Sequence, residues 1–299
     1  MAVIENTITT SNITTEVKEI DFVSRFETTW QALIEILGIM RPVRKEPGTK
    51  LVSSKATVVL QNGDVPEGDE VPLSQATVEP VYYEDLKLEP YRKRVTAQAV
   101  AKFGAQIAVQ KTDDAFLNEL TGNILDRFYT FLQTGTLKSS EDTFQMAVSM
   151  AVTNVKDKFK KLHLDYTNVV AFVNTVDVGR YLGAANISVQ EKNGIEYLKD
   201  FLGANTVIIS SEIPSGTVIA IPADNIILYY IDPSDGDFAE LGLNYTTGNG
   251  PTNLIGVHKE GVYGRVSGDT HALLGMKLFA EYLDGIAVVS ITAGTALGE

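Results

Sequence analysis

The sequence contains no cysteine, and this absence excludes disulfide frameworks, thiolate metal sites and cysteine nucleophiles. Its three histidines, His163, His258 and His271, stand apart along the chain and predict no metal centre. No run of about 18 apolar residues is present, so no transmembrane helix is predicted. The first fifteen residues lack the basic and apolar regions of a signal peptide. We therefore expect a soluble protein that is made in a cytoplasm.

Acidic side chains outnumber basic ones by 38 to 25, which gives a net charge of −13. This balance disfavours a protein that coats nucleic acid by neutralising phosphates. The motifs of common enzymes are also absent: the sequence has no P-loop, no nucleophile elbow, no zinc-protease motif and no glycine-rich dinucleotide fingerprint. The acidic turn 232-DPSDGD-237 does not fit a calcium loop, because the first and twelfth positions would be Ile231 and Gly242. We expect an exposed turn there, and we predict no catalytic residue, no cofactor and no metal site.

The N-terminal third of the sequence has the character of extended appendages. An apolar stripe with steps of three and four residues predicts a helix over about 16–38. Residues 41–95 hold six of the ten prolines, with strand-like runs at 56–61, 77–84 and 86–90. The dipeptide Asn62-Gly63 is typical of a type I′ hairpin turn. A polar, strand-rich excursion of this length suits an arm that lies across another molecule.

Charge is unevenly distributed along these appendages. Residues 41–55 carry a net +4, residues 61–90 a net −7, and 91-YRKR-94 a net +3. Blocks of opposite sign can pair with complementary blocks on a partner and set the register of the contact. The alternative is a set of solvated loops without a partner.

The remainder of the chain predicts a globular α/β part. We expect long helices over 112–134 and 141–162, strands at 167–174, 205–210, 216–222 and 226–231, and helical turns at 175–185 and 194–203. The segment 95–110 is expected to begin as a strand and end as a turn. Alternation in 275–292 predicts a hairpin that turns at Asp284-Gly285. The order of these elements indicates a small α/β domain over about 139–231.

This layout resembles the major capsid proteins of tailed bacteriophages with the Hong Kong 97-type fold. The local matches are 30-WQALIEILGIMRPVRKEPGTKL-51, the proline-bounded stretch 63-GDVPEGDEVPLSQ-75, and 91-YRKRVTAQAVAKFG-104 leading into 112-TDDAFLNELTGNILDRFYTFL-132. The resemblance implies an α+β fold with an N-terminal arm and helix (1–44), an extended β-hairpin loop (45–95), a peripheral domain with a long spine helix (96–138 and 232–299) and an axial α/β domain (139–231). The boundary within 232–260 stays open.

The resemblance also implies a function. Such proteins assemble with themselves into hexamers and pentamers of an icosahedral shell around double-stranded DNA, in the host cytoplasm, and become part of the virion. Scaffolding, portal and decoration proteins are the implied partners, without sequence-specific DNA binding and without a membrane. Because the chain starts directly with the arm, we expect either a separate scaffolding protein or a product that is already trimmed, and the initial Met1 favours the former. Candidate intersubunit contacts are Trp30, Arg41, Arg44, Val58, Val59, Glu67, Asp69, Glu70, Val81, Tyr82, Tyr83, Arg92, Lys93 and Arg94.

Three alternatives to a phage head remain open at this point. The first is an encapsulin-type nanocompartment, which has the same fold and holds enzymes in place of DNA. The second is another phage structural protein, such as a tail or decoration component. The third is an α/β enzyme that acts on a basic substrate.

Overall fold

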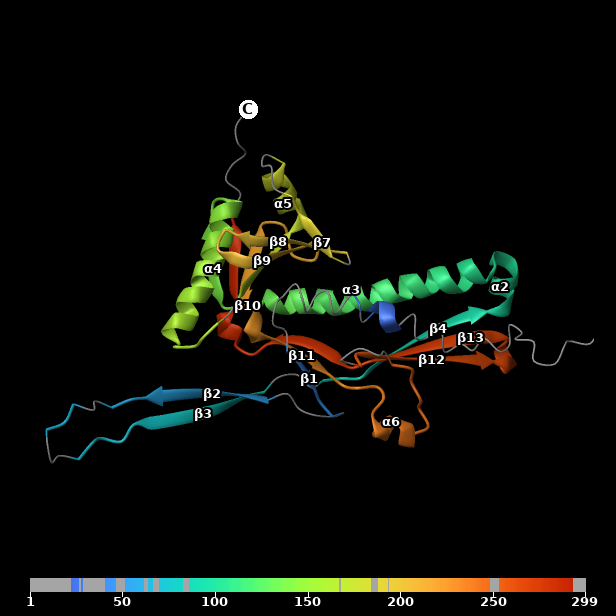
Figure 1. Cartoon of the computed structure of the whole chain (residues 1–299), viewed down its shortest axis with the longest axis horizontal. Helices are drawn as coiled ribbons and strands as arrows, with labels where there is room; N and C mark the ends of the chain where they lie inside the picture. Colours follow the sequence, from blue (N-terminus) through green and yellow to red (C-terminus); the bar gives the residue numbers. More distant parts are fainter. Residues whose placement is uncertain are drawn as a thin grey trace, which may run out of the picture.

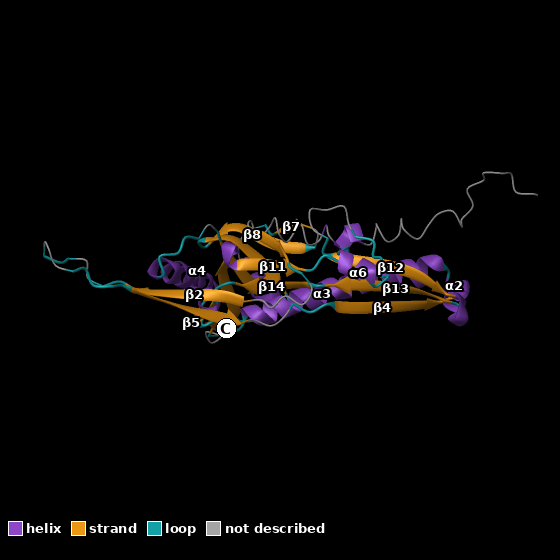
Figure 2. Cartoon of the chain, turned by 90° about the horizontal axis from the view of Figure 1, so that it is seen from below, coloured by secondary structure: helices purple, strands orange, loops and turns teal. Residues whose placement is uncertain are grey.

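The structure, a computed structural model, describes residues 23–26, 28, 41–46, 52–61, 64–66, 70–82, 86–166, 168–183, 188–192, 194–247 and 253–292. The molecule is elongated (Figures 1 and 2). A two-stranded hairpin projects from one end, a three-stranded sheet occupies the other end, and a long helix runs between a larger sheet and the rest. Among the described residues, no helix is both long and apolar enough to cross a membrane.

The largest unit is a seven-stranded sheet with the order β5-β15-β10-β6-β9-β8-β7. Its central strand β6 is buried along its whole length, as its unbroken run of apolar residues predicts. Thr143 caps helix α4, whose buried residues recur every three or four positions and lie against the sheet. The elements of this unit are β5 (Leu137–Glu141), α4 (Phe144–Lys161), β6 (Val169–Asn174), α5 (Thr175–Leu182), β7 (Gln190–Lys192), β8 (Ile195–Phe201), β9 (Ala204–Ser210), β10 (Thr217–Pro222) and β15 (Ala287–Ile291).

Helix α3 (Thr112–Leu132) confirms the predicted long helix. Its 21 residues correspond to about 32 Å, and a π-helical segment, η1 (Gln106–Lys111), precedes it without a break. Its buried face includes Leu120, Ile124, Phe128 and Leu132, which recur every four residues. α3 therefore forms the axis on which the other parts of the molecule pack (Figure 1).

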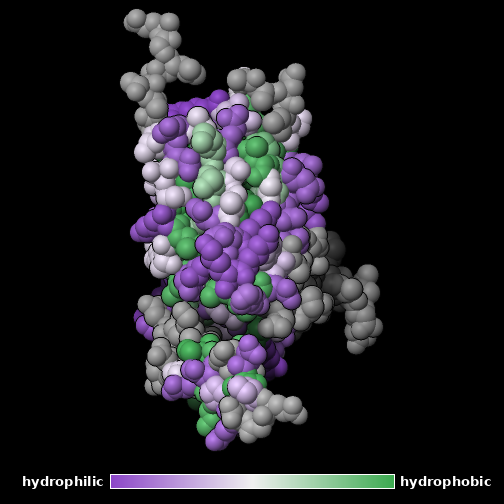
Figure 3. Space-filling model, turned by 90° about the vertical axis from the view of Figure 1, so that its left-hand side faces the viewer, coloured by the Kyte–Doolittle hydropathy of each residue, from purple (hydrophilic) through white to green (hydrophobic). Residues whose placement is uncertain are grey.

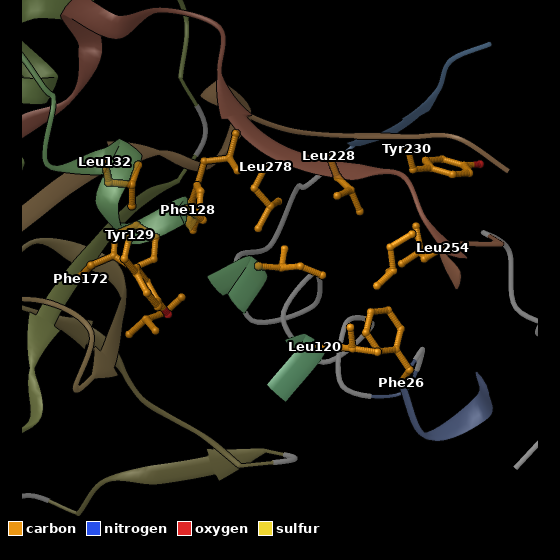
Figure 4. Close-up of a cluster of buried hydrophobic side chains, with 14 of the residues drawn as sticks. Phe26, Leu120, Phe128, Tyr129, Leu132, Phe172, Leu228, Tyr230, Leu254 and Leu278 are labelled. Atoms are coloured by element: carbon orange, nitrogen blue, oxygen red, sulfur yellow. The ribbon is translucent and has the colours of Figure 1, made fainter. Parts of the chain in front are cut away.

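The main core joins α3 to the sheets on either side of it (Figure 4). Phe128 and Tyr129 each meet Phe172 of β6 with ring centroids 5.8 Å apart and steep interplanar angles. Burial raises the pKa of Tyr129 to about 12, so this phenol stays protonated and packs as a neutral aromatic ring. Phe26, in the helical residues 23–26 and 28, is buried in the same core. That part of the predicted 16–38 helix is confirmed, and its remainder lies outside the described residues.

Two three-stranded sheets and the hairpin complete the fold. One sheet has the order β1-β11-β14 and the other β12-β13-β4, while the hairpin pairs β2 with β3. Short helices and turns connect them. These elements are β1 (Arg41–Arg44), β2 (Val52–Val59), β3 (Gln75–Tyr82), β4 (Glu89–Thr96), α2 (Ala97–Phe103), η2 (Ala223–Asn225), β11 (Ile226–Tyr230), α6 (Gly236–Glu240), β12 (Ile255–Val262), η3 (Tyr263–Arg265), β13 (Ser267–Leu274), β14 (Met276–Ala280) and η4 (Leu283–Gly285).

Three local predictions were wrong. The segment 194–203 contains strand β8 (Ile195–Phe201) rather than a helical turn, because pairing with β9 and β7 outweighs its weak helical pattern. The segment 95–110 begins as a strand as predicted, since Val95 and Thr96 end β4, but the predicted turn is wrong: residues 97–103 and 105–111 are helical, and Thr96 caps α2 at its start. The predicted hairpin over 275–292 does not form. β14 pairs with β11 and β15 pairs with β10 and β5, so Asp284-Gly285 lies in a turn that passes from one sheet to another.

We predicted that the α/β domain ends at residue 231, but the assignment of strands to sheets does not follow that boundary. Strand β11 precedes that boundary but pairs in the β1-β11-β14 sheet. Strand β15, near the end of the chain, returns to the seven-stranded sheet, where it runs parallel to β5. The hairpin of β2 and β3 forms as predicted, but its ladder ends at the pair Val59 and Gln75. The strands are therefore joined through residues 60–74, and Asn62-Gly63, where the turn was predicted, lies outside the described residues.

Candidate intersubunit surfaces

The β2–β3 hairpin is the first candidate surface, because it exposes apolar side chains that the rest of the described chain leaves uncovered. Val58 and Val59 are each 56% exposed, and Leu73 is 91% exposed. Leu60, Val71 and Val78 are exposed on the same hairpin. Figure 3 looks at the end of the molecule from which the hairpin projects, where hydrophobic and hydrophilic residues are interspersed. Clustered exposed apolar groups of this kind typically mark a surface that another molecule covers.

The hairpin also has open edges. Within the described residues, β2 and β3 pair only with one another. An isolated two-stranded ribbon is marginally stable in water, and each outer edge presents unpaired backbone groups to a potential partner strand. Residues 60–74 add an acidic run of Asp64, Glu67, Asp69 and Glu70 without a basic residue.

Several predicted contact residues cannot be placed by their side chains. Val81 and Tyr82 lie in β3, and the backbone of Tyr82 pairs with that of Val52 in β2. Arg41 lies in β1, and its backbone pairs with that of Ile227 in β11. Their side chains, and the whole of Trp30, Glu67, Asp69 and Tyr83, lie outside the described residues. Glu70 is described and exposed. The intersubunit contacts of all these residues stay predictions.

Arg44 already has partners within the chain. Its guanidinium donates to Asp235 at 2.9 Å and lies 3.7 Å from Asp232, and the hydrogen bond to Asp235 raises the pKa of Arg44. Asp232 is mostly buried and accepts hydrogen bonds from Ser234 and Asn253. The acidic turn 232–237, which we expected to be exposed, therefore holds one buried carboxylate that helps to fix β1 on the body of the molecule.

The basic run at 92–94 is divided between the two faces of the β12-β13-β4 sheet. Arg92 and Arg94 point to one face and both donate to Asp269 of β13, whose side chain is fully buried. The hydrogen bond from Arg94, followed by that from Arg92, holds the pKa of Asp269 far below its usual range. Lys93 points to the opposite face, toward α3. The intersubunit role predicted for these residues is not tested, but each already has an intrachain partner.

On the face toward α3, charges are paired at both ends of the helix. Asp113, in the first turn of α3, accepts from Lys93 and from Lys259 of β12, and all three side chains are nearly buried. Farther along the helix, Arg127 pairs with Glu89, which also accepts from Tyr91 at 2.6 Å. The pKa of Glu89 is lowered: burial raises it, but the hydrogen bonds from Arg127 and Tyr91 outweigh that effect. These contacts fasten the sheet to the helix.

Solved structures identify the architecture. The capsid asymmetric unit of cyanophage A-1(L) matches with a TM-score of 0.55 and 12% identity, over 86% of this chain and 92% of that chain. The capsid of cyanophage P-SCSP1u matches with a TM-score of 0.52 and 8% identity, over 87% and 88%. The capsid of a native GTA particle matches with a TM-score of 0.52 and 11% identity, over 89% and 91%. This chain has the Hong Kong 97-type capsid fold.

Sequence comparison alone does not reach this conclusion, since no protein-family model and no curated protein matches the chain. The Hong Kong 97-type fold confirms the predicted α+β class. The long helix α3 and the extended β2–β3 hairpin are both in the places where the sequence predicted them.

One surface of this Hong Kong 97-type fold was not predicted. A largely apolar cleft of about 770 Å³ lies between α2, η1 and the ends of β12 and β13. Tyr263 at its rim is 95% exposed, and Phe103 and Ile107 are exposed nearby. The sequence offers no periodic signal for this cleft, because its walls come from two segments, 93–109 and 259–270, that are far apart in the chain.

Proposed function

We propose that this chain is the major capsid (head) protein of a tailed bacteriophage. It assembles with itself into hexamers and pentamers of an icosahedral shell that encloses a double-stranded DNA genome. The observation that carries the proposal is the capsid fold, which matches cyanophage capsid structures over nearly nine tenths of both chains. The role is structural rather than catalytic.

The hairpin supports self-assembly. Val58, Val59 and Leu73 expose apolar surface to water. Covering such surface with a neighbouring subunit stabilises the assembly by about 25 cal/mol per Å² of apolar surface buried. A shell surrounds each subunit with identical neighbours, so the same hairpin can be covered at every position. In this proposal the hairpin and its flanking residues, 45–95, form the extended loop that lies over a neighbouring subunit.

The sheets support a division into two further parts. We assign the seven-stranded unit, which contains α4 and α5, to the axial domain that meets its copies around a capsomer axis. We assign α3 with the β12-β13-β4 sheet to the peripheral domain. The placement of β11 and β15 shifts the proposed boundary from residue 231 to about residue 222 and returns β15 to the axial part.

The negative net charge supports a shell that encloses DNA without binding its phosphates tightly. A net charge of −13 provides no broad phosphate-neutralising surface. In this proposal the DNA is retained by the closed shell, and the protein is found in the virion after assembly in the host cytoplasm. Scaffolding, portal and decoration proteins are its proposed partners.

Electron microscopy of the expressed chain, with and without the products of neighbouring genes, tests the proposal. Closed particles that contain DNA after infection support a phage head. Closed particles that copurify with an enzyme cargo and contain no DNA indicate an encapsulin-type compartment instead. Deleting residues 58–85 is expected to leave a folded protein that forms no shells, and normal shells from this variant would contradict the proposed role of the hairpin.

A further inference from the structure

The β12-β13-β4 sheet brings together two histidines that are separated in the sequence. His258 of β12 lies directly opposite His271 of β13, and His271 in turn lies opposite Arg92 of β4. Two positions farther along the ladder, Glu260 lies opposite Asp269, which lies opposite Arg94. Side chains two positions apart on a strand point to the same face. All six side chains therefore project from one face of the sheet.

That face is the one turned away from α3. The residues between these positions, Lys93 and Lys259, reach Asp113 of α3 on the other side. In Figure 1 the sheet lies between α3 and the short helix α6. The segment that follows α6 lies along the free edge of β12, where the backbone of Thr246 pairs with that of Val257. The side chain of Tyr245 lies against Gly256. The cluster is thus flanked on one side by an ordered segment.

A small cavity connects the three groups that can bind a metal ion. It has a volume of about 240 Å³ and is lined by His258, Glu260, His271 and residues 242–245. The Nε2 atom of His271 lies 3.3 Å from Oε1 of Glu260. Two ligands that are each about 2.0–2.1 Å from a tetrahedral ion are separated by about 3.3 Å. The pair is therefore already spaced as two ligands of one ion, and it is open to solvent on the cavity side.

We propose that His258, Glu260 and His271 form a binding site for one divalent transition-metal ion, such as Zn²⁺. Two imidazoles and one carboxylate are a common ligand set for this ion, with water at the fourth position. His258 is not among the ligand atoms that lie within 4.8 Å of one another in this structure, which come from Glu260, Asp269 and His271. The exposed side chain of His258 has to rotate toward the cavity to become a ligand, and the cross-strand Cβ spacing of about 4.5–5.5 Å allows its ring to reach an ion bound by His271. The cavity exceeds the roughly 30 Å³ share of one water molecule several times over, so it holds the ion with its water.

Asp269 is close enough to be considered as a fourth ligand, but its contacts assign it another role. An oxygen of Asp269 lies within 4.8 Å of ligand atoms of Glu260 and His271. Both oxygens of Asp269 already accept hydrogen bonds from Arg92 and Arg94. Asp269 therefore balances and holds the two guanidiniums, and it leaves Glu260 as the carboxylate that faces the cavity.

Isothermal titration of the untagged, chelator-treated full chain with Zn²⁺ tests the site. We expect saturable binding of one ion per chain. Binding is expected to weaken at least tenfold in His271→Ala and in Glu260→Gln, because each removes one ligand. His163→Asn alters the one histidine outside the site and is expected to bind like the parent protein.

Co²⁺ provides a second measurement on the same variants, since a tetrahedral Co²⁺ site absorbs strongly in the visible range. The absorption is expected in the parent protein and lost in His271→Ala. If His271→Ala does not fold, Glu260→Gln decides the question, because Glu260 is half exposed and glutamine has the same size. No saturable binding in the parent, or equal binding by the parent and the folded ligand variants, would overturn the proposal.

Discussion

Arg94 donates two hydrogen bonds, each 2.6 Å long, to the two carboxylate oxygens of Asp269 across the β4–β13 ladder. The two residues are 175 positions apart in the sequence. Charge-assisted contacts to both oxygens of a carboxylate are among the strongest polar interactions in proteins. This pair joins the strand that leaves the extended hairpin to a strand near the end of the chain.

Asp269→Asn tests how much this contact contributes. The variant leaves two guanidiniums facing a neutral amide, and their lost pairing is expected to lower the melting temperature by several degrees. Thermal denaturation of the unassembled protein measures the change. Asp165→Asn alters an exposed carboxylate after α4 and serves as the control, with a melting temperature close to that of the parent. Equal melting temperatures for both variants would contradict the importance of the contact.

The same contact predicts a dependence on pH. The pKa of Asp269 is lower in the folded protein than the value of about 3.9 expected for an unfolded chain. A carboxyl with a lowered pKa contributes stability that is fully present above its unfolded pKa and is lost as the pH falls through its folded pKa. The difference in urea midpoint between the parent and Asp269→Asn should therefore be constant near neutral pH and shrink below about pH 4. A difference that grows on acidification would contradict the predicted sign.

Asp113 and Asp114 offer a matched comparison at the start of α3. Asp113 accepts from Lys93 and Lys259, both nearly buried, whereas Asp114 is half exposed and pairs with Arg25. Removing one partner of a buried ion pair leaves an uncompensated charge, so Asp113→Asn is expected to cost about 3 kcal/mol of unfolding free energy. Asp114→Asn is expected to cost less than about 1 kcal/mol. Urea denaturation of both variants checks the ranking, and a larger loss for Asp114→Asn would refute it.

Gly285 lies where the chain passes between two sheets. A Cβ atom at this position would lie 2.5 Å from Cε2 of Phe159 and 3.2 Å from Nδ2 of Asn225. Gly285→Ala therefore overpacks this junction and is expected to cost about 2 kcal/mol. A Cβ atom at Gly179 in α5 would meet nothing within 4 Å, so Gly179→Ala is expected to be neutral or to stabilise by up to about 1 kcal/mol. Chemical denaturation measures both changes.

The sequence predicts helices and strands of this fold well where one apolar pattern, helical or strand-like, continues over the whole element. Helix α3 and strand β6 were placed within two residues of their observed ends, because their apolar patterns are long and unambiguous. The pattern of 275–292 alternates as a hairpin would, yet its two halves join different sheets. Local alternation reports that a segment is a strand and does not report which strand it pairs with.

The candidate surface was predicted less completely for the same reason. The run 91-YRKR-94 reads as one basic block of the sequence, but alternation along β4 sends Lys93 to Asp113 and sends Arg92 and Arg94 to Asp269. Neither acidic partner is near the run in the sequence. The exposed apolar residues of the hairpin could be predicted, because their strand pattern and flanking prolines are local features.

The hairpin provides the most direct prediction about assembly. The triple variant Val58→Ser, Val59→Ser and Leu73→Ser changes side chains that are more than half exposed, so the unfolding free energy is expected to change by only about 0.5 kcal/mol. Shell formation is expected to be lost, because the variant lacks the apolar groups that the proposal places under a neighbouring subunit. Leu241→Ser alters another exposed leucine, after α6, and is expected to leave assembly intact.

Electron microscopy of the purified parent chain and this triple variant, under the same conditions, tests the central claim most directly. We expect closed icosahedral particles from the parent and only dispersed, folded subunits or capsomers from the variant. Parent protein that forms no closed particles, alone or with a scaffolding partner, would contradict the proposed function. Normal particles from the triple variant would contradict the role assigned to the hairpin.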